Sequence, residues 1–361
     1  MRVQVVDPPA FTAPYDHALC AALARAGADV ELVTSRFAHG PAPPVDGFVV
    51  RECFYRLAGG APRSTVRRAA KLASHLPDLL RYRRGGRDAD VVHVQWLTLP
   101  ALDAALLPRG RALVYTAHNA QREHPGPGER RMYRRADALV VHSESARAHL
   151  SGRHGVDPAR IHVIAHGAFD YLTRLPAEQG LPEELAAVRG PVALCFGLLR
   201  PYKGIDVLLE AWRSVGVGEL WIVGAPRMDV AALRASSPRG VRWVPRFLPD
   251  PELPAYFRRA DLVVLPHRRV DQSGAAFAAL AFGRPLLLTD VGGFRDLASA
   301  GAASLVPPDD PDALRGELRR LLEDPIARAR LAEGSRAAAA GPYAWDAIGR
   351  RTVALYSSLV G

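Results

Sequence analysis

The sequence predicts an α/β protein made of two doubly wound parallel-sheet domains. Short apolar runs rich in β-branched residues alternate along the chain with amphipathic stretches of helical length. Continuous apolar runs between helices are typical of parallel strands that are buried on both faces. The alternation runs once, is interrupted, and starts again, and 361 residues hold two full cores at about 150 residues each. We therefore expect two Rossmann-like domains that face each other across a cleft.

The first domain is expected to span residues 1–170. Its apolar runs predict strands at 3–6, 29–34, 47–52, 90–94, 112–116, 138–142 and 161–165. The second domain is expected to span residues 191–342, with strands at 191–196, 220–224, 241–244, 261–266, 285–289 and 303–306.

The segment between the two series, 171–190, contains two prolines and two glycines in irregular positions. Such punctuation predicts a linker between the domains. The last stretch, 311–361, is helical in pattern and contains no strand. Its final part, 343–361, is long enough to form a helix that crosses back onto the first domain.

Composition places the chain among ordinary soluble globular proteins, with 48% apolar and 23% charged residues. No apolar run approaches the roughly 20 residues that span a bilayer. The amino terminus runs straight into a strand-like stretch and lacks the features of a signal peptide. The three cysteines are too few for a disulfide framework or a cysteine-based zinc site. We expect a cytoplasmic protein.

The formal net charge of +10 allows nucleic acid, anionic lipid or a phosphorylated small molecule as a partner. Only Lys71 and Lys203 are lysines among the 47 basic residues, so most of the excess reflects a general preference for arginine. The basic residues do not cluster with aromatic stacking positions, and no nucleic-acid partner is expected.

The turn at 196–206 follows a predicted strand and precedes a predicted helix. Gly197 lets the backbone turn tightly beneath a ligand, the helix amino terminus offers free N–H groups, and Arg200 and Lys203 add two cations. This combination favours a phosphate or diphosphate site. The alternative is an ordinary strand-to-helix turn with surface cations.

A second glycine-containing turn, 267–274, follows the strand predicted at 261–266. Ser273 and Gly274 open a helix of small residues, so a hydroxyl and a backbone N–H point out of the carboxyl edge of the sheet. Because the two turns belong to one sheet, they can share one diphosphate. The alternative is that Ser273 simply caps its helix.

Five segments together resemble the retaining, nucleotide-sugar-dependent glycosyltransferases of family four, which have the GT-B fold. They are the Gly-x-x-x-x-x-Lys-Gly turn at 197–204 and the segments 256–266, 282–293, 115–119 and 136–143. The resemblance covers nearly the whole chain in the right order. It implies that the first domain binds an acceptor and that the second binds a nucleotide sugar.

The departures from the family pattern affect the donor side. Family members usually carry Gly-Arg-Leu where this chain has Gly197 followed by two leucines, and Arg200 could replace the missing arginine. The two glutamates of the family fall at Val270 and Ala278. The sequence Gln272-Ser273-Gly274 is similar to a variant of this turn that still meets the donor. A proline-rich loop at 7–16 replaces the Gly-Gly of the family's first loop.

The resemblance also implies roles for individual residues. His118 matches a histidine that contacts the donor sugar, and its alternative role is structural. The nucleotide base is expected beside Arg246, Phe247 and Leu248. Candidates for acceptor recognition lie at the carboxyl ends of first-domain strands or in the following loops: Tyr15, Asp16, His17, Gln95, Trp96, Asn119, Glu123 and His124.

The predicted activity is transfer of a sugar from a UDP- or GDP-sugar to an acceptor hydroxyl, with retention of configuration. Arg200, Lys203 and the 272–274 turn would stabilise the departing diphosphate. No cofactor is expected, and the candidate metal pairs fail on context, since His162 and His166 would lie about 13 Å apart on a strand. A sugar-nucleotide epimerase and a non-catalytic sugar-nucleotide binding protein are the alternatives.

One further segment, 63–84, reads as a basic amphipathic helix, with Arg63 at its start and leucines among its arginines. Such a helix is typical of weak contact with a membrane surface. The alternative is a helix that is merely solvated.

Overall fold

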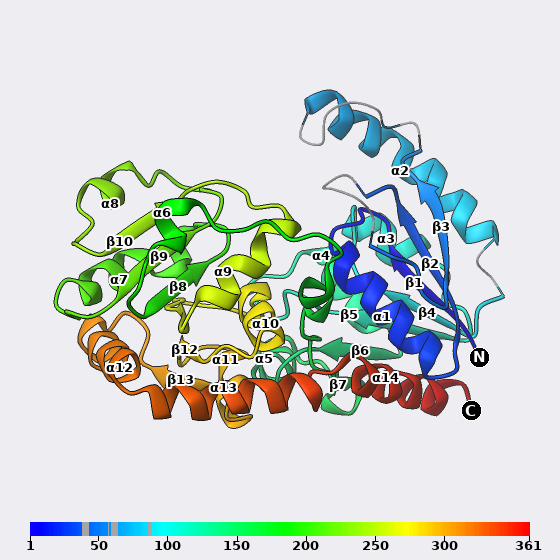
Figure 1. Cartoon of the computed structure of the whole chain (residues 1–361). Helices are drawn as coiled ribbons and strands as arrows, with labels where there is room; N and C mark the ends of the chain where they lie inside the picture. Colours follow the sequence, from blue (N-terminus) through cyan, green and yellow to red (C-terminus); the bar gives the residue numbers. More distant parts are fainter. Residues whose placement is uncertain (38–42, 57, 59–63, 86–87) are drawn as a thin grey trace. The chain divides into compact units, whose positions relative to one another are not determined.

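The computed structural model describes residues 1–37, 43–56, 58, 64–85 and 88–361. The chain divides into two units, which are Met1–Ala165 together with Trp345–Gly361, and His166–Ala344 (Figure 1). Arg63 lies outside the described residues. Among the residues that are described, no helix is both long and apolar enough to cross a membrane.

The first unit contains a parallel sheet of seven strands in the order β3-β2-β1-β4-β5-β6-β7. Strand numbers increase from β1 outward to β3 on one side of the sheet, and from β4 outward to β7 on the other. The order therefore reverses between β1 and β4, where doubly wound sheets bind their ligands. The strands are β1 (Arg2–Asp7), β2 (Asp29–Ser35), β3 (Val49–Phe54), β4 (Val91–Val94), β5 (Ala112–Thr116), β6 (Ala138–Val141) and β7 (Ile161–Val163).

Helices cover both faces of this sheet. One face packs against α1 and the carboxyl-terminal helix α14, whose Gly349 lies so close to α1 that a Cβ there would be 2.4 Å from the Ala22 carbonyl oxygen. The other face packs against α2 to α5, through residues such as Leu79 and Met132. The helices of this unit are α1 (Ala13–Arg25), α2 (Thr65–Gly85), α3 (Pro100–Leu106), α4 (Pro127–Arg135), α5 (Glu144–His154), the 3₁₀ turn η1 (Pro158–Arg160) and α14 (Trp345–Val360).

The second unit repeats the scheme with a six-stranded parallel sheet in the order β10-β9-β8-β11-β12-β13. Its order reverses between β8 and β11. The strands are β8 (Val192–Phe196), β9 (Glu219–Val223), β10 (Val241–Val244), β11 (Leu262–Leu265), β12 (Leu286–Thr289) and β13 (Ala303–Val306). The helices are η2 (Asp170–Arg174), α6 (Glu183–Ala186), η3 (Pro201–Lys203), α7 (Ile205–Trp212), α8 (Ala231–Ala235), η4 (Asp250–Glu252), α9 (Leu253–Arg259), α10 (Gly274–Ala281), α11 (Phe294–Ser299), α12 (Pro311–Glu323) and α13 (Pro325–Ala340).

The predicted fold class is confirmed. Every predicted strand is present with its bounds within two residues. Short β-branched apolar runs between helices have few alternatives to forming a buried strand. The final helix belongs to the first unit, as expected for a helix that crosses back.

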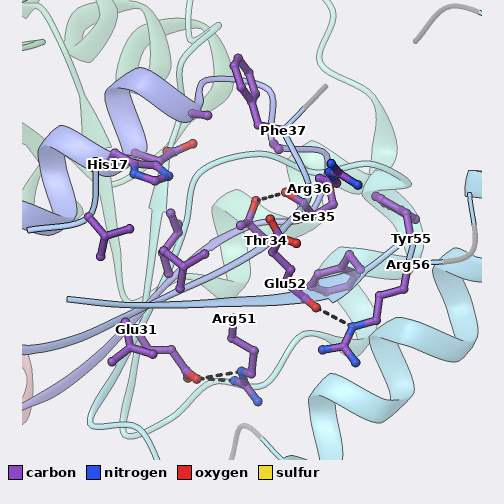
Figure 2. Close-up of a pocket in the computed structure, with 18 of the residues that line it drawn as sticks. His17, Glu31, Thr34, Ser35, Arg36, Phe37, Arg51, Glu52, Tyr55 and Arg56 are labelled. Carbon is purple, nitrogen blue, oxygen red and sulfur yellow. Dashed lines mark hydrogen bonds and ion pairs between the residues drawn. The ribbon is translucent and has the colours of Figure 1, made fainter. Parts of the chain in front are cut away.

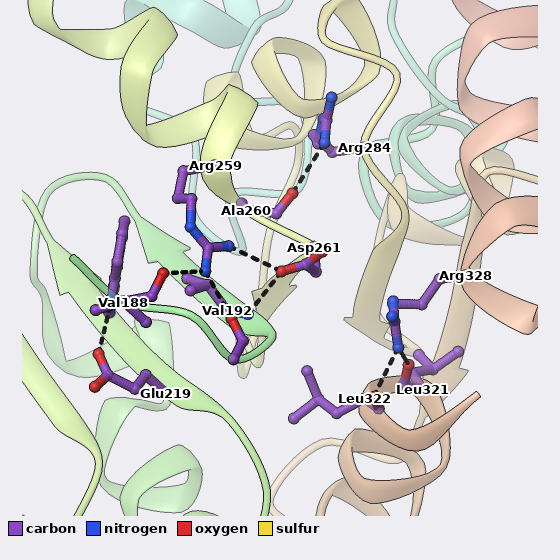
Figure 3. Close-up of polar contacts among 12 residues, drawn as sticks. Val188, Val192, Glu219, Arg259, Ala260, Asp261, Arg284, Leu321, Leu322 and Arg328 are labelled. Atoms are coloured by element: carbon purple, nitrogen blue, oxygen red, sulfur yellow. Dashed lines mark hydrogen bonds and ion pairs between the residues drawn. The ribbon is translucent and has the colours of Figure 1, made fainter. Parts of the chain in front are cut away.

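The boundary between the units differs from the predicted one. The second unit begins at His166, and the segment predicted as a linker, 171–190, packs on that unit. Leu172 and Leu185 are buried. The Arg259 guanidinium, which is held by Asp261, donates to the carbonyl oxygens of Val188 and Gly190 (Figure 3). Proline and glycine marked irregular backbone here, but they do not show whether that backbone is anchored.

The turn after β8 comes very close to the end of β11 at Gly204. This glycine adopts φ +65° and ψ +30°, and a Cβ there would lie 2.0 Å from the Pro266 carbonyl oxygen, just beyond β11. Gly155 has nearly the same backbone angles, φ +62° and ψ +27°, but no atom lies within 4 Å of its Cβ position.

We predict that Gly204→Ala lowers the free energy of unfolding more than Gly155→Ala does. The left-handed conformation costs about 1–2 kcal/mol in both variants, and the steric overlap adds about 1–3 kcal/mol at Gly204 alone. Urea unfolding followed by circular dichroism measures the difference. Equal losses would mean that the turn does not contact the end of β11.

Candidate functional site

The two glycine-containing turns of the second unit lie at neighbouring strand ends. β8 and β11 pair in parallel, with Ala193 opposite Leu262 and Leu194 opposite Val263. Their carboxyl ends therefore meet at the same edge of the sheet, at the point where the strand order reverses. Such switch points are where open α/β sheets bind ligands.

Arg268 fastens the two turns together. Its backbone N–H donates to the Tyr202 carbonyl oxygen at 2.8 Å, and its guanidinium donates to the Pro201 carbonyl oxygen, also at 2.8 Å. The guanidinium also pairs with Asp206 at 2.7 Å and with Asp309 at 2.6 Å. The positive charge of Arg268 is thus neutralised within the protein. Sequence reasoning gave this residue no role, because its partners are distant along the chain.

Lys203 extends from the first turn into the protein and meets His267 from the second. Its Nζ lies 2.6 Å from His267 Nε2, and a Cβ on Gly197 would be 3.6 Å from the same Nζ. His267 is fully buried. Burial lowers the pKa of Lys203 to about 8 and also lowers the pKa of His267. The site therefore holds a poorly solvated cation whose acceptor among the described residues is the neutral imidazole of His267.

Ser273 is buried just before α10, and its Oγ has no hydrogen-bond partner among the described residues. In particular, it makes no capping bond to α10, so the interpretation of Ser273 as a simple N-cap is wrong. Gly274 is exposed and begins the helix. Gln272 lies against Gly293, where a Cβ would be 2.4 Å from the Gln272 Nε2. Arg200 is exposed, and no ion pair involving it is found in the described part of the chain.

The three residues expected near a nucleotide base differ in their exposure and in their hydrogen-bond partners. Arg246 is engaged in a bidentate pair with Glu252, and Leu248 is buried. Phe247 is 63% exposed, so its ring is accessible for stacking on a base. Ala278, at the position of the family's second glutamate, is buried within α10.

In the first unit, His118 belongs to a chain of hydrogen bonds. His142 Nδ1–H donates to the Ile164 carbonyl oxygen at 2.9 Å, and its Nε2 accepts from His118 Nδ1–H at 3.2 Å. His118 Nε2 lies 3.0 Å from the amide of Gln95. If that amide is turned, its NH₂ group donates to His118 and gains the partner that it otherwise lacks. Burial lowers the pKa of His142 to about 4, so the His142 ring is neutral at pH 7.

Aromatic rings surround His118. It stacks on Trp96 at 4.7 Å with an interplanar angle of 6°, and it meets Tyr15 edge-on at 5.2 Å. The structure thus brings together His118, Trp96 and Tyr15, all of which were predicted as site residues. Both ring nitrogens of His118 already have protein partners, which favours its structural role at least in part. The structure places Asn119, Glu123 and His124 in an exposed loop after β5.

A pair of buried carboxyl groups lies beside these rings. Asp7, at the end of β1, accepts from the backbone N–H of Phe11 at 2.6 Å, and the Thr12 hydroxyl donates to Asp16 at 3.4 Å. Burial raises the pKa of both carboxyls, and the neighbouring charge of Asp7 raises that of Asp16 further. Their Oδ1 atoms have no partner among the residues described. Asp16 was predicted as a site residue, whereas Asp7 was not.

A pocket of about 1170 Å³ opens next to Asp16 in the first unit. Figure 2 shows His17, Thr34, Ser35, Arg36 and Tyr55 around it. His17 Nδ1–H donates to the Pro44 carbonyl oxygen at 3.2 Å. The buried Ser35 Oγ has no partner in the described part of the chain. Unpartnered buried oxygens are costly, so this side chain would gain from a further hydrogen-bond partner.

Two family profiles match the chain. "Glycosyltransferase Family 4" matches residues 15–168, and "Glycosyl transferases group 1" matches residues 190–324. The D-inositol 3-phosphate glycosyltransferase of Salinispora arenicola is 30% identical over 90% of this chain and 82% of its own length. The corresponding enzyme of Kineococcus radiotolerans is 29% identical over 95% and 89%.

Solved structures show the same fold. Sucrose-phosphate synthase from Thermosynechococcus elongatus matches with a TM-score of 0.73 and 19% identity, over 99% of both chains. Anabaena Alr3699/HepE in complex with UDP-glucose matches with a TM-score of 0.72 and 17% identity, over 99% of this chain and 100% of that one.

We predict that Lys203 titrates at about pH 8, as its burial requires. Because the chain has only two lysines, labelling with [¹³Cε]lysine gives two NMR signals, and Lys71→Arg identifies the one that belongs to Lys203. The pKa of a free lysine is about 10.4, so the unfolded chain binds more protons between the two values. Stability should therefore rise with pH across this window. A Lys203 signal that titrates near pH 10 would contradict the buried contact with His267.

Proposed function

The chain belongs to glycosyltransferase family 4, and from this premise we propose that it transfers a sugar from a nucleoside diphosphate donor to an acceptor hydroxyl with retention of configuration. The observation that carries the proposal is the poorly solvated Lys203 at the adjoining ends of β8 and β11. A cation in such surroundings interacts with a diphosphate far more strongly than one in water does. The Ser273 hydroxyl and the amino terminus of α10 supply further donors.

The reaction then depends on the leaving group. As the bond between the anomeric carbon and the diphosphate oxygen breaks, negative charge develops on that oxygen, and Lys203 stabilises it. The acceptor oxygen bonds to the anomeric carbon from the same face, and its proton passes to the departing phosphate oxygen. Asp206 and Asp309 are both held by Arg268, so neither is placed to act as a covalent nucleophile. This supports front-face attack.

Uridine diphosphate sugars are the first donors to test. The solved structure of Anabaena Alr3699/HepE contains UDP-glucose and shares the fold of this chain. The exposed Phe247 ring follows β10, where a base can stack on it. The positions of the family's glutamates, Val270 and Ala278, cannot bind a ribose through carboxylates, so the hydroxyls of the donor must be held by other groups.

The acceptor that the first unit fits best is a polyol that carries an anionic group. Asp16 and Ser35 line the pocket, and each has a buried oxygen without a partner among the described residues. Arg36 and Arg67 line the same pocket and provide positive charge. The relatives that align along most of the chain are named for action on D-inositol 3-phosphate, which combines both features.

A panel of nucleotide sugars tests the donor assignment. We predict that UDP-sugars raise the melting temperature, since a donor that binds only the folded state stabilises it by mass action. Incubation with inositol phosphate and with free inositol then tests the acceptor class, and product should form only with the phosphate. A new sugar nucleotide without any acceptor would indicate an epimerase instead. Binding with neither transfer nor donor hydrolysis would indicate a non-catalytic protein.

We further predict that Lys203→Ala lowers turnover on the order of 100-fold, the effect of losing one oriented group that stabilises charge. Arg239→Ala removes an exposed cation of the same unit and serves as the control. Steady-state kinetics with the donor from the panel give kcat for both variants, and circular dichroism checks that they fold. Near-normal turnover in Lys203→Ala would remove the basis of the proposal.

A further inference from the structure

The outer face of α2 in the first unit is apolar. Val66, Leu72, Leu76 and Leu80 are 73%, 50%, 40% and 37% exposed. The three leucines are four residues apart, so they form one stripe along the helix. Ala69, Ala73 and Pro77 are exposed as well and extend this face. We call the set of these seven residues the α2 outer face.

The inner face of α2 carries polar groups that a surface helix usually turns outward. His75 is fully buried, with Nε2 2.6 Å from Asp103 Oδ1 and Nδ1 2.7 Å from the Tyr55 hydroxyl. Asp78 is also buried and accepts from the Tyr55 backbone N–H at 2.8 Å. If the helix rolled to bury its leucines, these polar groups would lose their partners at a high cost. The helix is therefore fixed with its leucines outward.

Positive charge borders the α2 outer face. Arg68, Arg83 and Arg84 are exposed, and no ion pair is found for them within the described residues. Asp78, the sole acidic residue of α2, faces inward and pairs with Arg81 at 2.6 Å. Outward, the helix thus presents leucines flanked by arginines and no negative charge. A second copy of this face would add like charges, whereas a lipid surface supplies apolar chains next to phosphates.

We propose that α2 docks this protein on an anionic lipid bilayer, with the α2 outer face at the boundary between headgroups and acyl chains. The arginines contact lipid phosphates, each adding roughly 1 kcal/mol near such a surface. Arg67, on the flank of the same helix, lines the pocket of the first unit. Docking through α2 thus brings that pocket close to the lipid surface. The proposal does not depend on the identity of the donor or acceptor.

Flotation of the full chain with vesicles tests the proposal. Vesicles of phosphatidylcholine alone are compared with vesicles that also contain phosphatidylglycerol. We expect binding only to the second kind, and we expect it to weaken as salt is raised. The triple variant L72Q/L76Q/L80Q should bind at least about tenfold more weakly, since three apolar side chains leave the bilayer. Because these side chains are exposed, the variant should keep its circular dichroism spectrum and melting temperature.

A second pair of variants separates specific docking from general attraction of a basic protein. Arg83→Gln with Arg84→Gln should also weaken binding. The control is Arg239→Gln with Arg330→Gln, which also removes two exposed arginines, here from the second unit. The control should bind like the unaltered chain. The proposal would be overturned if the control lost as much vesicle binding as the α2 variants do. It would also be overturned if the unaltered chain did not bind anionic vesicles. Sedimentation showing a dimer that the leucine variant abolishes would assign the face to self-association instead.

Discussion

A charge that is held away from water at the end of a central strand is the constraint around which the second unit is arranged. The turns after β8 and β11, which hold Lys203 and His267, are fastened to each other by Arg268, and Gly204 lets them approach closely. Arg268 is neutralised by two aspartates, whereas within the described residues Lys203 contacts the imidazole of His267 and the ring of Tyr202 and forms no ion pair. The same elements that stabilise the sheet edge thus leave one cation in need of an anion, which is the condition for binding a diphosphate.

The first unit shows the opposite arrangement at the equivalent place in its sheet. Where β1 and β4 separate, it buries the carboxyl groups of Asp7 and Asp16, and burial raises the pKa of both. An acid pair of this kind suits hydroxyl groups, which can both donate to and accept from carboxyl oxygens. The two switch points therefore have different chemistry although the folds around them are alike. Fold similarity alone would not have distinguished them.

Much of the fold could be predicted from the sequence, because apolar runs and their spacing report directly on buried parallel strands. The positions of Lys203 and Ser273 at adjoining strand ends were also predictable, since both lie in glycine-containing turns that follow predicted strands. His267, Arg268, Asp7 and Ser35 were not. Their importance arises from contacts with residues that are far away in sequence or from the absence of a partner, and neither leaves a local pattern. The boundary at His166 was missed for the same reason, since anchoring by Arg259 is a tertiary contact.

The packing of α14 on α1 has a consequence for the order in which the chain folds during synthesis. The second unit is continuous from His166 to Ala344 and is complete before the last helix has been made. The first unit lacks part of its core until then, because Trp345 packs on Tyr15, and the Tyr356 hydroxyl lies 2.5 Å from His93. The part of the protein that leaves the ribosome first is therefore the part that matures last. Until α14 has been made, the acid pair and its pocket stand on an unfinished scaffold.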